Sequence, residues 1–401
     1  MENQLCGLQT PCYILDEDQY RQNIRVFQDS FRSAWGGECA FGYSVKTNHL
    51  RWPLQMAREA GFLAEVVSPD EYEYVRGLGV PEAEIIYNGP QKGDTVLSAL
   101  AAGALVNLDS LEECETVALA AEAGKLDRDA LRVGLRVNFD LEARCPGETT
   151  AGREGSRFGI CEENGDLGRA VEMLGRAGVP VSGLHMHQSS GTRSLRVFRA
   201  LAEAAGEAAE KYALGDLTFI DMGGGFFGGN FFPGKPTPPE YADAVCGTLC
   251  RRFDPARVTL VLEPGAGILA TAMDYLARVI GLRQVRGMHI ATLDGTLLHI
   301  NPFMRPHPVP CTMVNPGPEM APGEREKWII AGSTCMEMDR IDPREMPCCP
   351  RRGTLFLFHC CGAYMATHNS FFINAAPTIY ARRGGEYTLL RRKDPHLMGE
   401  W

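Results

Sequence analysis

The sequence predicts an α/β protein, a (β/α)8 TIM-like barrel followed by a C-terminal all-β domain, and two observations support this fold class. Near-continuous apolar runs alternate with helical segments rich in alanine, leucine and glutamate, which is typical of parallel strands joined by helices. Eight such runs indicate a closed barrel. After about residue 270 the helical periods give way to short strand-like runs. The expected barrel strands are Phe41–Lys46, Leu63–Ser68, Ile85–Asn88, Leu105–Asp109, Val133–Phe139, Val181–His187, Thr218–Asp221 and Thr259–Glu263.

The ends of the chain are expected to come together in the second domain. Cys12–Leu15 predicts a short strand, and Asp16 is a typical N-cap for a helix that runs to about Ser33. The proline-rich stretch Asn301–Pro322 predicts a long surface loop. The expected segments are 1–30, which joins the β domain, 31–270, which forms the barrel, and 271–401, which forms the β domain. The later strands are expected at Tyr275–Leu282, His289–Leu293, Trp328–Ala331, Thr354–His359, Thr378–Arg382 and Tyr387–Leu390.

Composition narrows the possible functions and compartments. A net charge of -10 argues against a nucleic-acid partner, and no apolar run is long enough to cross a membrane. The N-terminus lacks the layout of a signal peptide, so we expect a cytoplasmic protein with reduced thiols. Five possible zinc ligands cluster in the sequence, but vicinal cysteines are poorly placed to share one ion, and we expect no metal site. These residues are Cys348, Cys349, His359, Cys360 and Cys361.

Side chains that can take part in catalysis or ligand binding lie at the carboxyl ends of the predicted strands, where the active sites of such barrels are found. Lys46 ends an otherwise apolar run, and a buried cation is costly unless it has a partner or a function. Desolvation lowers the pKa of a lysine, which frees its amine to form a Schiff base. The alternative is a lysine that extends from the strand end into solvent. The strand ends carry Lys46, Ser68, Asn88, Asp109, Arg136, His187, Asp221 and Glu263.

Three further motifs fit a phosphorylated, planar ligand. Gly223–Gly225 follow the seventh strand, where barrels often bind phosphate through backbone N–H groups, although such a triplet can also be a simple turn. His185 and His187 share one face of a strand, so they suggest either a metal site, for which no third ligand stands out, or a flat surface for an aromatic ring. Glu263 could form a structural ion pair or hold a proton on the nitrogen of a ring.

Taken in order, the motifs resemble the fold-type III pyridoxal-phosphate (PLP) decarboxylases, which include the diaminopimelate, ornithine and arginine decarboxylases and share an alanine-racemase-like barrel. The resemblance covers nearly the whole chain, and the order and spacing of the motifs make it specific. The matching stretches are Thr10–Tyr13, Tyr43–Asn48, Glu65–Ser68 with Glu71, Ser156–Gly159, Gly183–His187, Asp221–Gly225, Glu263–Gly265, Cys335 with Asp339, and Gly362–Tyr364.

The resemblance implies a role for each matching residue in the barrel. Lys46 is expected to hold PLP as an internal aldimine, His187 to stack on its ring and Glu263 to face the ring nitrogen. A carboxylate in that position keeps the nitrogen protonated and deepens the electron sink. The remaining residues expected around the cofactor and its phosphate are Glu65, Arg136, Ser190, Gly223, Gly224, Gly225 and Tyr364.

The resemblance also implies a head-to-tail homodimer with shared active sites. Cys335 is expected to reach the partner's site and return a proton to the α-carbon of an amino-acid substrate. Asp339 is expected to contact the far end of that substrate, and Glu337 and Arg305 are further candidates for substrate contacts. Glu263 and Cys335 favour decarboxylation over the related racemases, which use an arginine and a tyrosine in these roles. A racemase and a non-catalytic PLP-binding homologue remain the alternatives.

Three departures from the family pattern leave the substrate open. Ala266 stands where the family usually has an arginine that holds phosphate or substrate, and Gln188–Ser190 replaces a glycine-serine loop. Met336 stands where diaminopimelate decarboxylases carry a glutamate. We therefore expect an amino-acid decarboxylase for a diamino acid or a related substrate. The arginines that could compensate for Ala266 are Arg157, Arg193 and Arg305.

Overall fold

A computed structural model describes residues 2–229, 232–303, 309–318, 325–368 and 372–399. The chain forms two compact units, Asn23–Ile268 and Met1–Gln22 with Leu269–Trp401. The first is the barrel unit and the second, which contains both ends of the chain, is the β unit. The first boundary between the units lies inside the helix α2 (Glu17–Trp35).

Eight parallel strands close into the barrel, which confirms the predicted fold class. Their order around the barrel is β5-β4-β3-β2-β10-β9-β8-β6, and parallel pairing of β5 with β6 closes the ring. The short strand β7 (Ile160–Cys161) adds to the outer side of β6. The barrel strands are β2 (Cys39–Ser44), β3 (Leu63–Val66), β4 (Ile85–Tyr87), β5 (Leu105–Leu108), β6 (Arg132–Asn138), β8 (Val181–His185), β9 (Phe219–Asp221) and β10 (Thr259–Leu262).

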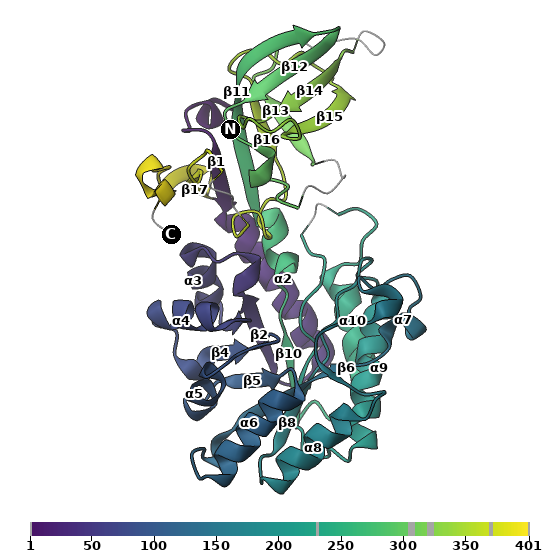
Figure 1. Cartoon of the computed structure of the whole chain (residues 1–401). Coiled ribbons are helices and arrows are strands. Elements are labelled where there is room, and N and C mark those ends of the chain that lie inside the picture. The colour runs from purple at the N-terminus through teal and green to yellow at the C-terminus, as the bar shows by residue number, and fades with distance from the viewer. Residues whose placement is uncertain (1, 230–231, 304–308, 319–324, 369–371, 400–401) are drawn as a thin grey trace. The chain divides into compact units, whose positions relative to one another are not determined.

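Helices lie outside the barrel strands, as Figure 1 shows. Several begin directly after a strand with a serine N-cap: the Ser68 and Ser110 hydroxyls accept hydrogen bonds from the Glu71 and Glu113 N–H groups, each at 3.2 Å. These caps fix where the loops at the active-site end of the barrel stop. The helices of this unit after α2 are α3 (Arg51–Glu59), α4 (Pro69–Gly77), α5 (Thr95–Ala101), α6 (Leu111–Glu122), α7 (Leu141–Arg144), α8 (Asp166–Arg176), α9 (Leu195–Lys211), α10 (Pro238–Leu249) and α11 (Ala266–Leu269).

The β unit is built on one branched sheet and also contains the short helix α1 (Glu2–Cys6). The main path of the sheet is β15-β14-β12-β11-β1-β17-β18, and β16 pairs with both β11 and β13. The early strand β1 therefore lies between β11 and β17. The strands are β1 (Cys12–Asp16), β11 (Met273–Val285), β12 (Met288–Leu293), β13 (Cys311–Val314), β14 (Lys327–Ala331), β15 (Arg340–Glu345), β16 (Leu355–Phe358), β17 (Thr378–Arg383) and β18 (Glu386–Arg391).

The structure corrects several local predictions. The predicted surface loop Asn301–Pro322 contains the strand β13, because its Cys-Thr-Met-Val run pairs antiparallel with β16 and completes that edge of the sheet. Strand β15 was not predicted, since its charged sequence gives no apolar alternation. Asp16 does cap α2, accepting a hydrogen bond from the Gln19 N–H at 3.1 Å. Of the helices in the described residues, none has the length and apolar character needed to cross a bilayer.

An aromatic cluster supports the loop that follows β9. Phe226 is fully buried, with its ring centroid 4.4 Å from that of Phe198 and 5.2 Å from those of Phe27 and Tyr241. Phe31 completes the cluster at 5.6 Å. Edge-to-face and stacked rings at these separations are favourable beyond the apolar area that they bury. The cluster therefore holds the chain in place immediately after Gly223–Gly225.

We predict that Phe226→Ala lowers the free energy of unfolding by about 3–5 kcal/mol, because it removes the central ring of this cluster and leaves a cavity. Chemical denaturation followed by circular dichroism measures the change. Leu119→Ala is the control, since Leu119 is 59% exposed and its truncation should cost less than about 0.5 kcal/mol. Equal losses for the two variants would contradict the packing described here.

Candidate active site

Lys46 and Glu65 form an ion pair at the carboxyl ends of two adjacent strands. β2 ends at Ser44, and Lys46 follows in the 3₁₀ turn Val45–Thr47. The Lys46 Nζ lies 2.6 Å from Glu65 Oε1 and 2.5 Å from Glu65 Oε2. Glu65 is fully buried on β3, whereas the lysine side chain is 36% exposed. The lysine therefore has a fixed carboxylate partner while part of its side chain stays exposed, which suits a covalent attachment point.

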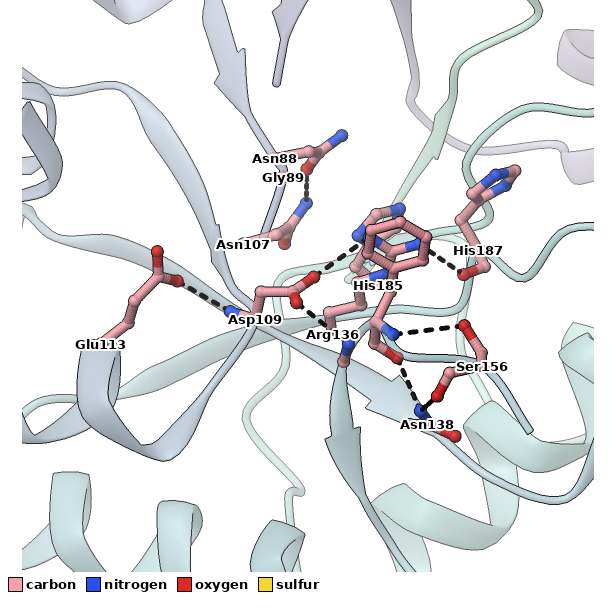
Figure 2. Close-up of polar contacts among 12 residues, drawn as sticks. Asn88, Gly89, Asn107, Asp109, Glu113, Arg136, Asn138, Ser156, His185 and His187 are labelled. Atoms are coloured by element: carbon pink, nitrogen blue, oxygen red, sulfur yellow. Dashed lines mark hydrogen bonds and ion pairs between the residues drawn. The ribbon is translucent and has the colours of Figure 1, made fainter. Parts of the chain in front are cut away.

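Two asparagines connect this pair to further acids. The Asn88 side-chain N–H groups donate to Glu65 Oε1 at 3.0 Å and to Glu263 Oε1 at 2.6 Å. The Asn107 side-chain N–H groups donate to Asn88 Oδ1 at 2.8 Å and to Asp221 Oδ2 at 2.9 Å. Figure 2 shows Asn88 and Asn107 joined in this way. Both amides are buried, so the hydrogen bonds replace those that water would otherwise make.

Asp221, Glu263 and His185 lie together at the floor of the site. One polar side-chain atom from each of the three lies within 4.8 Å of those of the other two, and all three residues are buried. Burial raises the pKa of Asp221 to about 7 and raises the pKa of Glu263 well above its usual range, with the Asp221 charge adding to the effect on Glu263. Burial and the charge of Arg136 hold the pKa of His185 well below its usual value, so this histidine is neutral.

His185 is the last residue of β8, and His187 follows it in the loop. Their rings are stacked, with centroids 6.2 Å apart and an interplanar angle of 11°. His187 lies two residues beyond the end of β8 and is half-buried. Desolvation and the charges of Arg136 and Lys46 lower the pKa of His187 to about 3. A neutral ring in this position offers a flat aromatic face. Among the described residues, the candidate metal ligands that lie together are His185, Asp221 and Glu263, without His187, and both carboxyl groups already accept hydrogen bonds from amide groups.

Arg136 joins two loops beside the histidines. Its guanidinium donates to Asp109 Oδ1 at 3.0 Å and to the His187 carbonyl oxygen at 3.2 Å, and it lies 4.9 Å from the centre of the Phe158 ring. The Gly159 N–H donates to Asp109 Oδ2 at 3.1 Å. Figure 2 shows Arg136 between Asp109 and His187. Arg136 therefore holds the backbone of His187 in place.

The turn Gly223–Gly225 fits tightly between His187 and Glu263. Gly223 has φ +64°, and its N–H donates to Asp221 Oδ1 at 2.8 Å. A Cβ added at Gly224 would lie 2.4 Å from the Glu263 carbonyl oxygen, which leaves no room for any side chain. The turn therefore presents bare backbone at the rim, as an anion-binding loop requires.

Ser190 and Arg193 occupy the loop after β8. The Ser190 hydroxyl donates to the Glu148 carbonyl oxygen at 2.9 Å and accepts the Arg193 N–H at 3.0 Å. Arg193 has φ +52°, its carbonyl accepts from the Tyr241 hydroxyl at 2.6 Å, and its guanidinium lies 5.0 Å from the centre of the Phe227 ring. Ala266 begins α11 and carries no charge toward this loop.

The remaining predicted residues lie in the β unit or outside the described residues. Cys335 and Glu337 are exposed, whereas Asp339 is buried. Asp339 accepts hydrogen bonds from the Leu297 N–H at 2.8 Å, the Thr334 N–H at 3.0 Å and the Thr334 hydroxyl at 2.7 Å. It therefore shapes the loop that carries Cys335. The two other residues are Tyr364, half-buried with φ +69°, and Arg305, which lies outside the described residues.

Sequence reasoning placed Asn88, Asp221 and Glu263 at strand ends, but it missed Asn107 and did not bring Asp221 and Glu263 together as a pair. Asn107 lies inside the strand β5, so a search of the strand ends could not find it. Asp221 was noted as a strand-end residue before the glycines, and His185 as one of two histidines on one face of a strand, without a partner for either. The available signal was a polar residue within each apolar run, since a buried polar side chain needs a partner.

A parallel barrel with a lysine, buried carboxylates and a bare glycine turn at the same rim defines a protein that can bind an aldehyde cofactor with an anionic tail. Residues 19–270 match the family model described as "Pyridoxal-dependent decarboxylase, pyridoxal binding domain". The chain belongs to this family. It is a pyridoxal-phosphate-dependent amino-acid decarboxylase, and hence a carboxy-lyase, as the sequence predicted.

Named relatives agree with this assignment. The chain is 28% identical over 385 residues to a probable chloroplastic diaminopimelate decarboxylase of Oryza sativa subsp. japonica, covering 92% of this chain and 74% of the relative. It is 30% identical over 284 residues to a chloroplastic ornithine decarboxylase of Nicotiana glauca, covering 69% and 59%. The fold matches that of the M. jannaschii diaminopimelate decarboxylase in complex with L-lysine, with a TM-score of 0.87, 22% identity, and coverage of 99% of this chain and 92% of that one.

We predict that Gly224→Ala destabilises the protein by about 1–3 kcal/mol and weakens PLP binding, because the new methyl group must displace the backbone at Glu263. Denaturant titration and PLP titration by fluorescence measure the two effects. Gly175→Ala is the matched control: Gly175 lies in α8 with open space at its Cβ position, so this change should stabilise by about 0.5 kcal/mol. PLP affinity unchanged in Gly224→Ala would argue against a cofactor at this turn.

Proposed function

We propose that this decarboxylase acts on a diamino acid or a related amino acid, with Lys46 as the covalent attachment point and Cys335 as the proton donor to the α-carbon. The observation that carries the proposal is the Lys46–Glu65 pair, with Nζ–O distances of 2.6 and 2.5 Å, at the carboxyl ends of β2 and β3. Bound PLP supplies an electron sink for the bond that breaks at the α-carbon.

The residues of the barrel floor would hold and tune the cofactor. Glu65 orients the Lys46 amine and balances its charge until the amine reacts. Glu263, held by the Asn88 amide, would face the ring nitrogen. His187 would cover one face of the ring, since Arg136 holds its backbone and its imidazole is neutral. These residues fit the cofactor because each is held by partners within the site: Glu65 by Lys46 and Asn88, Glu263 by Asn88, and His187 through its backbone by Arg136.

The phosphate would lie at the Gly223–Gly225 turn. Backbone N–H groups in a turn of this kind bind phosphate oxygens, and a nearby cation adds charge-assisted binding. Arg193 supplies that cation in our proposal. Its charge contributes to the lowered pKa of His187, which contacts the same turn, and its backbone is fixed by Ser190 and Tyr241. Arg193 thereby replaces the arginine that position 266 lacks.

The substrate end of the site is proposed to come from the β unit of a second subunit. Cys335 and Glu337 are exposed on the loop that Asp339 organises, so both can meet a ligand from outside their own unit. An exposed carboxylate at Glu337 suits the distal ammonium of a diamino acid. The curated relatives act on substrates of this kind according to their names, which supports the same class.

A substrate panel tests the function. Holoprotein is incubated with L- and D-diaminopimelate, ornithine, lysine and arginine, and both carbon dioxide release and product chirality are measured. Decarboxylation of one diamino acid, with no racemisation of the remaining substrate, supports the proposal. Racemisation without carbon dioxide would replace it, and inactivity toward the whole panel would remove the proposed substrate class.

We predict that Lys46→Ala abolishes carbon dioxide release and the visible absorbance of the bound cofactor, because no other amine replaces the attachment point. Absorbance spectra before and after borohydride, with mass spectrometry of the fixed adduct, measure the covalent link. Lys125→Ala changes an exposed lysine on the same unit and should keep the wild-type spectrum. An adduct that maps to another lysine would overturn the assignment of Lys46.

We predict that Cys335→Ser slows turnover at least tenfold while PLP stays bound, because a hydroxyl is a much weaker acid than a thiol. Mixing this variant with Lys46→Ala should restore part of the activity if each site uses both subunits. Cys250→Ser, which changes another exposed cysteine, is the control. Wild-type turnover in Cys335→Ser would remove the proton-donor role, and failure of the mixture to recover activity would remove the shared site.

A further inference from the structure

The barrel floor holds more buried acids than cations. Glu65 and Asp221 are completely buried and Glu263 is 3% exposed, so none of them is stabilised by bulk water. Among the described side chains, Lys46 alone brings a positive charge within hydrogen-bond distance of any of the three. An isolated buried carboxylate is so costly that it takes up a proton instead. We therefore expect the three carboxyl groups together to bind at least one proton.

Asp221 and Glu263 are the two acids that can share a proton. An oxygen of the Asp221 carboxyl and one of the Glu263 carboxyl lie within 4.8 Å of each other, and neither is bonded to a cation among the described side chains, so protonation of one acid relieves their repulsion. Their oxygens accept N–H groups: Asp221 from Gly223 at 2.8 Å and Asn107 at 2.9 Å, and Glu263 from Asn88 at 2.6 Å. These donors suit an ionised partner, so one proton between the two acids satisfies every contact.

The charged and titratable groups on the other strands do not neutralise the Asp221–Glu263 pair, which is consistent with one proton on the pair. Lys46 on the β2 side is bound to Glu65 of β3, and Arg136 of β6 is bound to Asp109, which follows β5. Asn88 and Asn107 are neutral. His185 of β8 lies 4.0 Å from Glu263, and its neutral ring adds no charge. His187 is also neutral, for the reasons given above.

We propose that Asp221 and Glu263 share a single proton in the cofactor-free protein, and that Glu263 delivers this proton to the ring nitrogen when PLP binds. The O–H bond at Glu263 breaks, the N–H bond at the ring forms, and the carboxylate that remains pairs with the pyridinium. Asp221 stays ionised under its two N–H donors. The total charge of the buried cluster does not change, so the ring is protonated without taking a proton from solvent. Asp221 is a positioning residue in this scheme.

Infrared spectroscopy of full-length protein tests the proposal. PLP is removed, and the carbonyl stretching band of protonated carboxyl groups is recorded at pH 7 in water and deuterated water. We expect a buried carboxyl band in the cofactor-free protein that disappears when PLP is added. It should persist when an analogue with carbon in place of the ring nitrogen is added, because that ring cannot accept the proton. No such band in the wild-type cofactor-free protein, or the same loss with the carbon analogue, would overturn the proposal.

Variants identify the acids that carry the band. Asp221→Asn and Glu263→Gln should each shift or weaken the band, since each replaces one of the two acids that hold the proton. Glu71→Gln is the matched control: burial raises the pKa of Glu71 to about 7, but Glu71 accepts from the Val67 N–H outside the pair. A band that is unchanged in Asp221→Asn or lost in Glu71→Gln would assign the proton elsewhere. The inference uses the cofactor site proposed above, but this test needs no turnover and can fail while decarboxylation stands.

The pH dependence of stability gives a second measurement. The folded cofactor-free protein keeps a proton that the unfolded chain loses above pH of about 4, so its stability should fall as pH rises from about 4 through 7. Because Asp221→Asn removes the charge that adds to the raised pKa of Glu263, the stability of this variant should fall less steeply over this range. Melting temperatures of the cofactor-free proteins measure the slopes. Equal slopes in wild type and Asp221→Asn would contradict proton sharing.

Discussion

The candidate active site depends on three buried carboxyl groups that have one lysine among them. Glu65 is balanced by Lys46, but Asp221 and Glu263 have no cation of their own within reach among the described residues. Two asparagines supply the hydrogen bonds that water cannot, and they connect all three acids into one network. Each of these side chains makes at least one hydrogen bond, which restricts its conformation, although the buried Asn107 Oδ1 has no partner. The chemistry at the rim therefore relies on a floor whose geometry is set before any ligand arrives.

Closure of the barrel makes this network possible. Asn107 is on β5 and Asp221 ends β9, and these strands are not neighbours in the ring, so their hydrogen bond crosses the interior. The crossing needs space beside Asn107, which Gly134 of β6 provides: a Cβ there would lie 2.0 Å from Asn107 Oδ1. An open sheet with the same strands would leave the two residues far apart. The polar floor and the closed fold consequently stabilise each other.

This dependence explains which features could be predicted from sequence. Lys46 and Glu263 stand at the ends of apolar runs, and parallel strands bring such ends to one rim whatever their exact register. Asn107 could not be placed in this way, because a single polar residue inside a strand becomes informative only when its partner across the barrel is known. Strand β13 was missed for a similar reason, since it is stabilised by its pairing with β16 rather than by its own pattern.

The loop around Cys335 carries two acids, Asp339 and Glu337, that differ in burial and in the hydrogen bonds that they make. Asp339 matched the position of a substrate-binding acid, yet its carboxylate accepts three hydrogen bonds from its own unit. Acceptor oxygens that are already used and buried can add little to the binding of an ammonium group, because a new contact would break existing ones. Glu337 is exposed on the same loop, so it could bind an ammonium group without breaking the hydrogen bonds that hold Asp339. We infer that Asp339 acts through the loop that it shapes, and that recognition of the substrate's far end falls to Glu337.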